Sequence, residues 1–151
     1  MTNFEDIYDL AKVTMIDYKL DNLAIKDYDA FLTYFRSLLM TGMVEFSGCL
    51  TSLEYTSITE DEVTNWYFVE DLSLIEKNIL AKTIVLKWWE QHIQDVVVFQ
   101  PHMSSKNFKQ LQETTSLKQK SEYKDKLREE ISEAIEEYQL ANIDKLPFWG
   151  E

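Results

Sequence analysis

The stretch EDLSLIEKNILAKTIVLKWWEQHI, residues 70–93, constrains the fold more than any other part of the sequence. Its apolar residues recur at helical spacing, and Ser73 and Glu76 have the spacing of a capping box at its start. On a helical wheel these apolar residues form two adjacent stripes. The first consists of Ile75, Ile79, Leu86, Trp89 and Ile93, and the second of Leu74, Ala81, Val85, Trp88 and His92. They cover about half of the circumference, whereas a one-sided surface helix has an apolar stripe of about 100°. This helix therefore needs two neighbours, and we expect Trp88 and Trp89 to occupy different packing sites.

Two further helices are predicted to supply those neighbours. One covers about residues 28–46, with Asp27 as its N-cap, and its apolar residues share one face. Gly42 lies inside this helix, which indicates a close approach to a neighbouring element. The other covers about residues 106–140 and follows a break that contains Pro101, a residue that stops any helix before it.

The N-terminal part predicts a first helix that starts near Thr2 or Asn3, because Thr2 and Glu5 have capping-box spacing. Residues 47–71 change character, since they are rich in Thr, Tyr, Trp, Phe and Val and carry no helical period. The acidic sequence TEDE divides this segment into two short runs, which predicts a hairpin or an extended loop.

The predicted fold class is mainly α. We expect a small bundle of about four helices, with a β-hairpin or extended insertion at about residues 50–70 and a non-helical C-terminal arm. With only 3 Gly and 2 Pro in 151 residues, the chain has few tight turns, which disfavours a sandwich or barrel. We expect one domain over residues 1–140, with the insertion at about 47–71, and an arm over residues 141–151.

The net charge of −12 argues against a sequence-specific nucleic-acid binder, because affinity for phosphate backbones comes largely from Lys and Arg. The single cysteine, Cys49, cannot form an internal disulfide and is interpreted as a small buried apolar residue. No stretch has the roughly 20 apolar residues that cross a bilayer, and the start of the chain lacks the features of a signal peptide. We therefore expect synthesis in the cytoplasm and no membrane partner.

No motif in the sequence predicts an enzyme. His92 and His102 are the only histidines, and with Cys49 they lack the short repeating spacing of a zinc site. His92 shares a helical side with Trp88, so we interpret it as a packed or partly exposed structural residue. The acidic run at residues 60–62 lacks EF-hand spacing and is interpreted as a solvated turn. We expect no catalytic residue, no metal site and no cofactor.

The charges of the last predicted helix are segregated along its length. Basic residues lie in its first part, namely Lys118, Lys120, Lys124, Lys126 and Arg128. Acidic residues follow, namely Glu129, Glu130, Glu133, Glu136 and Glu137. This order opposes the helix dipole. It could be matched by complementary charge on a neighbouring subunit, or the helix could simply have a polar face of mixed charge.

The C-terminal tail is aromatic, with Phe148 and Trp149 directly after Leu146 and Pro147. Chain ends are usually polar and loose, so these large side chains call for a binding partner or a place in the core. Two interpretations are open: the tail folds back on its own core, or it is an arm that docks on another subunit. We favour the arm.

The order of these segments resembles the head-to-tail connector proteins, of the adaptor or head-completion type, of tailed phages of Firmicutes. The resemblance runs from FEDIYDL and MIDYKL, through MVEFSGCL and FVEDLSLIEKNILAKTIVLKWWEQHI, to SSKNFKQLQETTSLKQKSEYKDKLREEISEAIEEY. Its most specific part is residues 68–93, where the family pattern falls on Phe68, Glu70, Asp71, Leu72, Ser73, Glu76, Ile79, Leu80, Ala81 and Trp88 or Trp89. These are core and cap positions and form no catalytic motif.

The resemblance implies a structural virion protein in the phage neck. It implies a ring, a dodecamer in this family, that sits below the portal protein, extends the DNA channel without sequence-specific binding, and contacts a downstream stopper or tail protein. The residues that would dock on the portal are Leu146, Pro147, Phe148 and Trp149. Candidates for contacts between subunits or with the hairpin are Trp66, Phe68, Trp88 and Trp89. A different hypothesis, based on the charge alone, is a cytosolic acidic helical protein that inhibits a basic partner.

Overall fold

The computed structural model describes residues 1–15, 23–99 and 107–143. Along the chain its elements are β1 (Thr2–Asn3), α1 (Phe4–Thr14), α3 (Tyr28–Gly42), η1 (Met43–Glu45), β2 (Tyr55–Glu60), β3 (Val63–Phe68), α4 (Leu74–Phe99) and α5 (Asn107–Ala141). A short helical segment at residues 23–26 precedes α3. The predicted mainly α class, with helices and a hairpin insertion, is confirmed.

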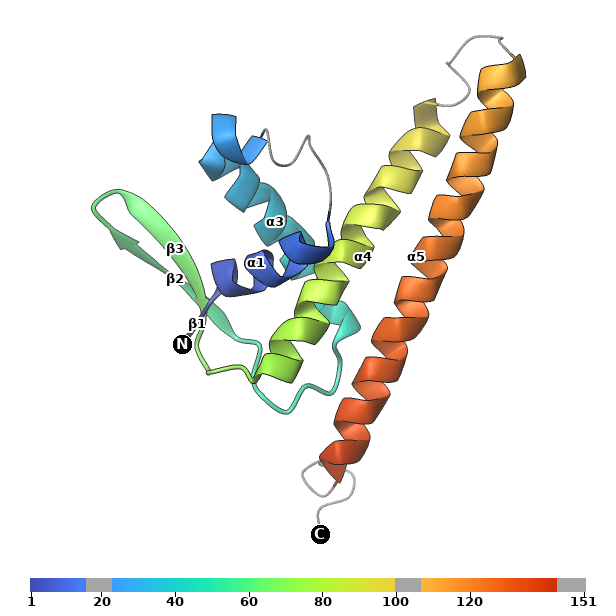
Figure 1. The fold of residues 1–151 in the computed structure, drawn as a ribbon. Coiled ribbons are helices and arrows are strands. Elements are labelled where there is room, and N and C mark those ends of the chain that lie inside the picture. The colour runs from blue at the N-terminus through green and yellow to red at the C-terminus, as the bar shows by residue number, and fades with distance from the viewer. Residues whose placement is uncertain (16–22, 100–106, 144–151) are drawn as a thin grey trace.

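Helix α4 lies at the centre of the subunit (Figure 1). Helices α1, α3 and α5 all pack against it. The sequence predicted two neighbours for this helix, and the structure provides a third, α1. The fully or nearly buried side chains of α4 are Glu76, Ile79, Leu80, Ala81, Thr83, Ile84, Val85 and Leu86. A helix that is covered on three sides explains the unusually wide apolar surface of the sequence.

The first turn of α4 departs from the predicted stripes. Leu74 and Ile75 were expected to pack, but their side chains are 65% and 61% exposed. The inward side of this turn is taken by Glu76, whose carboxylate faces residues from the 47–51 loop and from α5. The two apolar residues before it therefore remain on the outside.

The helix starts follow the predicted caps in two cases out of three. Asp27 accepts a hydrogen bond from the N–H of Ala30, and Ser73 and Glu76 form the reciprocal bonds of a capping box. The predicted Thr2–Glu5 box is wrong. Asn3 caps α1 by accepting from the N–H of Glu5, while the Thr2 hydroxyl accepts from the N–H of Leu72 at 2.9 Å. Thr2 is unavailable as a cap because it pairs with Phe68 in the sheet.

The helix ends also differ from the prediction. Helix α4 covers the described residues up to Phe99, past the expected break after residue 93. Helix α3 ends at Gly42, and the next three residues form a tighter 3₁₀ turn, although Phe46 beyond it is still buried. Apolar periodicity predicted the positions of these helices correctly but did not predict where they end.

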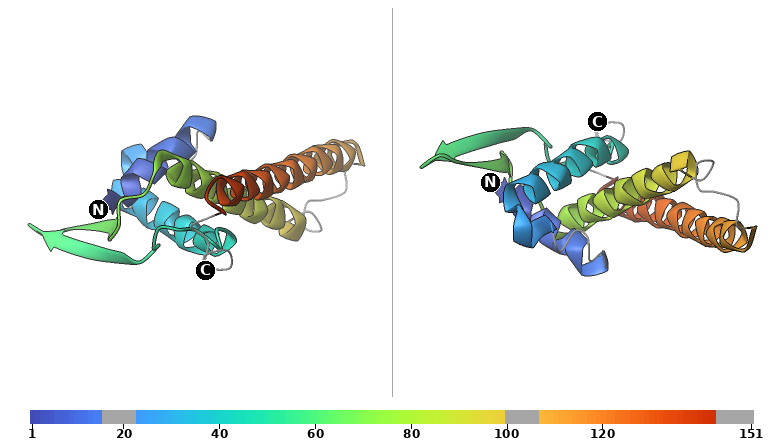
Figure 2. Two further views of the ribbon diagram at one scale, coloured as in Figure 1. Left: turned by 90° about the horizontal axis from the view of Figure 1, so that it is seen from below. Right: turned by 90° about the horizontal axis from the view of Figure 1, so that it is seen from above.

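Strands β2 and β3 form an antiparallel hairpin that extends away from the helices (Figure 2). Its two-residue turn is Asp61–Glu62, with φ of 51° and 65°. Positive φ at both positions is typical of a type I′ turn, which matches the twist of the flanking strands. The sheet order is β1-β3-β2, so β1 pairs only with the last two residues of β3.

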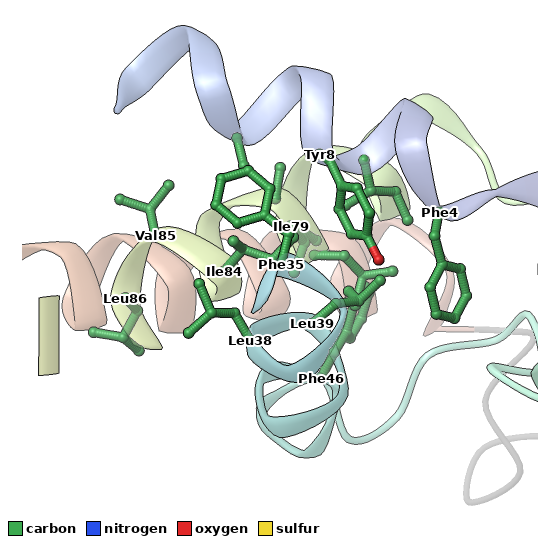
Figure 3. Packing of buried hydrophobic residues seen from close by; sticks show 14 of the residues in the cluster. Phe4, Tyr8, Phe35, Leu38, Leu39, Phe46, Ile79, Ile84, Val85 and Leu86 are labelled. Atoms are coloured by element: carbon green, nitrogen blue, oxygen red, sulfur yellow. The ribbon is translucent and has the colours of Figure 1, made fainter. Parts of the chain in front are cut away.

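The core lies between α1, α3 and α4 and is rich in aromatic rings (Figure 3). Phe35 of α3 contacts Tyr8 of α1 edge to face, with ring centroids 5.6 Å apart. At Gly42, α3 approaches α4 so closely that an added Cβ would lie 2.6 Å from the Thr83 hydroxyl oxygen. The close approach predicted from Gly42 is confirmed.

This contact predicts the effect of Gly42→Ala. Alanine normally stabilises the interior of a helix by up to about 1 kcal/mol relative to glycine. Here the added methyl group overpacks against Thr83, so we expect the free energy of unfolding to fall by about 1–3 kcal/mol. Urea unfolding would measure this loss. Thr41→Ala, at the exposed neighbouring position, is the control and should change stability by less than about 0.5 kcal/mol. A stabilised Gly42→Ala protein would contradict the close approach of α3 and α4.

Candidate interaction surfaces

A buried polar cluster around Glu76 holds three segments together. The Glu76 side chain is 3% exposed and accepts hydrogen bonds from the Tyr138 hydroxyl at 2.7 Å and the Thr51 hydroxyl at 2.9 Å. It also accepts from the Cys49 thiol at 3.2 Å and from the N–H of Ser73 at 2.8 Å. The cluster therefore connects the start of α4, the loop at residues 49–51 and the end of α5.

The ionisation of these groups follows from their contacts. Burial raises the pKa of Glu76, but the hydrogen bonds from Tyr138, Ser73, Cys49 and Thr51 outweigh it and bring the pKa down to about 2. Burial and the adjacent Glu76 carboxylate raise the pKa of the Cys49 thiol to about 12 and also raise the pKa of Tyr138. At neutral pH the carboxylate is charged and its donors keep their protons, an arrangement suited to structure.

Cys49 differs from its predicted role. It was expected to be a small buried apolar residue, but its side chain is only partly buried and bonds to a carboxylate. The reason is the Glu76 capping box, which brings a charged oxygen to the loop that follows η1.

Trp88 and Trp89 share one aromatic cluster. The expectation that they occupy different packing sites is wrong, because their rings touch edge to face with centroids 4.8 Å apart. His92 stacks on Trp88 at 5.4 Å and its Nε2 lies 3.3 Å from the Nζ of Lys120, while Trp89 contacts Tyr123 of α5 at 5.2 Å. Both indoles are half-buried, so the pair helps to join α4 to α5 and keeps some surface exposed. The packed, partly exposed position predicted for His92 is confirmed.

Trp66 and Phe68 pack within the subunit. Phe68 has no exposed surface, and its ring lies 4.6 Å from that of Phe4 at the start of α1. Trp66 is partly exposed, stacks on Phe4 and carries the guanidinium of Arg36 over its ring at 4.7 Å. These contacts and the ring of Tyr55, which lies 5.9 Å from that of Phe4, attach the base of the hairpin to the helices. The exposed apolar side chains of Ile58 and Val63 lie further along the two strands.

Helix α5 is held mainly from one side. Its buried side chains include Leu127, Ile131 and Tyr138, which face α4. Its charges contribute as well, since Arg128 forms ion pairs with Glu90 of α4 and Glu45 of η1, and Lys87 bonds to both acids. The hydrogen bond from Lys87 holds the pKa of Glu45 below its ordinary value.

The outer side of α5 carries a row of exposed carboxylates at helical spacing, at Glu122, Asp125, Glu129, Glu133 and Glu136. The basic residues that were predicted to pair with a neighbouring subunit have different surroundings in the structure. Arg128 is used within the subunit, Lys120 contacts His92, and Lys118 and Lys126 are exposed. Charged side chains of α5 on the side towards α4 thus form ion pairs within the subunit, whereas its outer side carries the row of carboxylates.

The sequence did not predict the exposed apolar residues at the start of α4 and the end of α5. Leu74 and Ile75 at the start of α4 are exposed, as is Leu140 at the end of α5, at 67%. The two helix ends are neighbours, because Tyr138 bonds to Glu76. We call Leu74, Ile75 and Leu140 the basal residues. The predicted stripes placed Leu74 and Ile75 in the core, whereas Leu140 lies off the apolar stripe of the last helix, two residues after Tyr138.

Other predicted positions lie outside the described residues. They are His102 and the docking residues Leu146, Pro147, Phe148 and Trp149. Within the described part, no group of three or more His, Cys, Asp or Glu residues is placed to hold a metal ion. Among the described helices, none combines the length and apolar character needed to cross a bilayer.

Comparison with known proteins adds no relative: no family model, no curated protein and no solved structure matches this chain.

The Glu76 cluster predicts a pH-dependent stability. The pKa of Glu76 is about 2 in the folded chain and 4.5 ordinarily, so its charged form stabilises the fold above pH 4.5. This contribution, about 3 kcal/mol at neutral pH, is lost as the pH falls from 4.5 towards 2. Glu76→Gln should therefore lower the free energy of unfolding by roughly 2–4 kcal/mol at pH 7, and by less than half as much at pH 3.

Urea unfolding at the two pH values would measure both effects. Glu129→Gln removes an exposed carboxylate from α5 and serves as the control, with an expected change below about 0.5 kcal/mol. If Glu76→Gln were equally destabilising at both pH values, the charge of Glu76 would not be the source of its contribution.

Proposed function

We propose that this chain is a structural head-to-tail connector of a tailed phage, an adaptor subunit that forms a ring below the portal. The observation that carries the proposal is the exposure of the basal residues at the neighbouring ends of α4 and α5; the last of them, Leu140, lies close in sequence to segment 144–151. Large apolar side chains exposed at one end of a small protein are typical of a surface that binds another protein. The portal protein is the proposed partner at this end, with Leu146, Pro147, Phe148 and Trp149 as the docking arm.

The hairpin supports assembly with further copies of the chain. Beyond Trp66 both of its faces are largely exposed, although a two-stranded ribbon is only marginally stable alone in water. Packing against an adjacent subunit would bury Ile58 and Val63. A ring, a dodecamer if the family resemblance holds, would give every hairpin the same neighbour.

The acidic side of α5 fits a channel wall. Duplex DNA passing through the ring is an anion, and like charge suppresses adhesion to the wall. In this proposal the row from Glu122 to Glu136 faces the channel, and the downstream stopper or tail protein binds the end opposite the portal. The role is structural, located in the virion neck, and involves no catalysis.

A second candidate is an acidic helical protein that binds and inhibits a basic partner. The observation that favours it is the same row of carboxylates on α5, which presents repeated negative charge along one helix. It predicts a monomer or dimer whose affinity falls steeply with salt.

A portal-binding experiment separates the two. Negative-stain imaging and mass measurement of the chain mixed with purified portal should reveal a discrete portal–ring complex. Ile75→Lys should abolish this complex and leave the free energy of unfolding within about 0.5 kcal/mol, because the side chain is exposed. Val13→Lys, at an exposed apolar position of α1, is the matched control and should bind normally. A dimer that ignores the portal would contradict the connector and favour the inhibitor.

Deletion of residues 146–151 tests the arm separately. We expect the helical circular dichroism signal and the thermal midpoint to be retained while portal binding weakens, because the arm is proposed to bury its aromatic side chains on the partner. Substitution of only Asp144 by Asn is the control within the same segment. A sharp fall in thermal stability on deletion would instead place the tail in the core of its own subunit.

A further inference from the structure

A small hollow lies in the corner between the hairpin and helices α1 and α3. Its volume is about 30 Å³, enough for one or two water molecules. The residues with polar groups that line it are Asn3, Glu5, Tyr8, Arg36, Thr64, Asn65 and Trp66. This corner plays no part in the proposed connector function.

Two hydrogen-bond donors of the hollow lie close together, the indole N–H of Trp66 and the guanidinium of Arg36. The Nε1 atom of Trp66 is buried and is the one such side-chain nitrogen or oxygen among the described residues without a hydrogen-bond partner. The Arg36 guanidinium stacks on the same indole, and no carboxylate of the described residues lies within ion-pair distance of it. A buried donor without an acceptor costs free energy, and a guanidinium pairs best with a carboxylate. Both groups therefore point to the same missing partner, an anionic acceptor.

The hollow also borders an open strand edge. Val69 donates its N–H to the Glu54 carbonyl on the β2 side, and alternate residues of an antiparallel strand face opposite neighbours. Thr64 and Trp66 therefore turn their backbone N–H and C=O groups to the other side. There β1 ends at Asn3, and α1 begins at the next residue. The edge of β3 over residues 63–66 is left without a paired strand in the described structure.

We propose that this corner binds an extended segment of a partner protein, which pairs with the open edge of β3 and places a carboxylate against Arg36 and Trp66. The backbone of Thr64 and Trp66 supplies the strand pairing, as in other cases where a peptide adds a strand to a sheet. Arg36 and the indole N–H select an acidic side chain. Glu5 also lines the hollow, but its Oε1 accepts from the Tyr28 hydroxyl at 3.3 Å, and its charge opposes an incoming acid.

The probe is the peptide acetyl-Thr-Val-Glu-Val-Thr-amide, added to the ¹⁵N-labelled full chain, with its Gln counterpart as the control. Binding should shift the indole N–H signal of Trp66, which Trp66→Phe identifies, in a saturable way. It should also slow hydrogen exchange at the backbone amides of Thr64 and Trp66. The amide of Asn65 faces β2 and should not change. The Gln peptide should bind about tenfold more weakly, since it loses a charge-assisted hydrogen bond.

Two variants give opposite results if the assignment is right. Arg36→Met should weaken binding of the Glu peptide by about tenfold, with Arg36→Lys between it and the parent protein. Glu5→Gln should tighten binding, because it removes the competing negative charge. The proposal is overturned if the two peptides bind equally, if neither shifts the Trp66 signal, or if the amides of Thr64 and Trp66 gain no protection. None of these outcomes depends on ring formation, so this experiment tests the peptide site independently of the proposed connector function.

Discussion

The burial of α4 on three sides is the constraint on which the rest of the structure depends. Its interior positions Leu80, Thr83 and Ile84 have no exposed surface, so each neighbouring helix must fit closely against it. Helix α3 approaches α4 closely because a glycine, Gly42, lies at the contact. Helices α1 and α3 are in turn packed against each other through the rings of Tyr8 and Phe35. Apart from the hairpin and the ends of the helices, little of the subunit can move without disturbing this helix.

The Glu76 cluster extends this constraint to the loop that follows η1 and to the end of α5. The loop at residues 49–51 and the last turns of α5 are attached to α4 by hydrogen bonds to one carboxylate. A buried charge is tolerated there because four donors surround it and hold its pKa near 2. The cost of this solution is local, since the same inward-facing turn leaves Leu74 and Ile75 exposed. The apolar end of the subunit is therefore a consequence of how α4 is capped.

Much of this arrangement was predictable from local rules. Helical periodicity, the Asp27 cap, the Ser73–Glu76 box, Gly42 and the acidic turn each report on contacts within a few residues or on one helix face, and all are confirmed. Two of the failures involve partners distant in sequence: Thr2 is drawn into a sheet with Phe68, and Cys49 meets a carboxylate 27 residues away. A third involves the adjacent residues Trp88 and Trp89, whose rings touch although helical spacing directs them to different stripes. The corner around Arg36 exists only once α1, α3 and the hairpin have been brought together, so no spacing in the sequence could indicate it.

The exposed features are distributed over different parts of the subunit, and this distribution favours an assembly protein over a single-partner inhibitor. The hairpin extends from the far side of α1 and α3 relative to α4 and α5 (Figures 1 and 2). The basal residues lie where α4 begins and α5 ends, and the acidic row follows the outer side of α5. An acidic inhibitor of a basic partner needs only the acidic row. In such a protein the exposed apolar residues would have no function and would promote aggregation. A ring subunit needs several surfaces at once: one for each neighbour, one for the component above or below, and one that DNA passes without binding. The connector accounts for all three surfaces, and the inhibitor accounts for one.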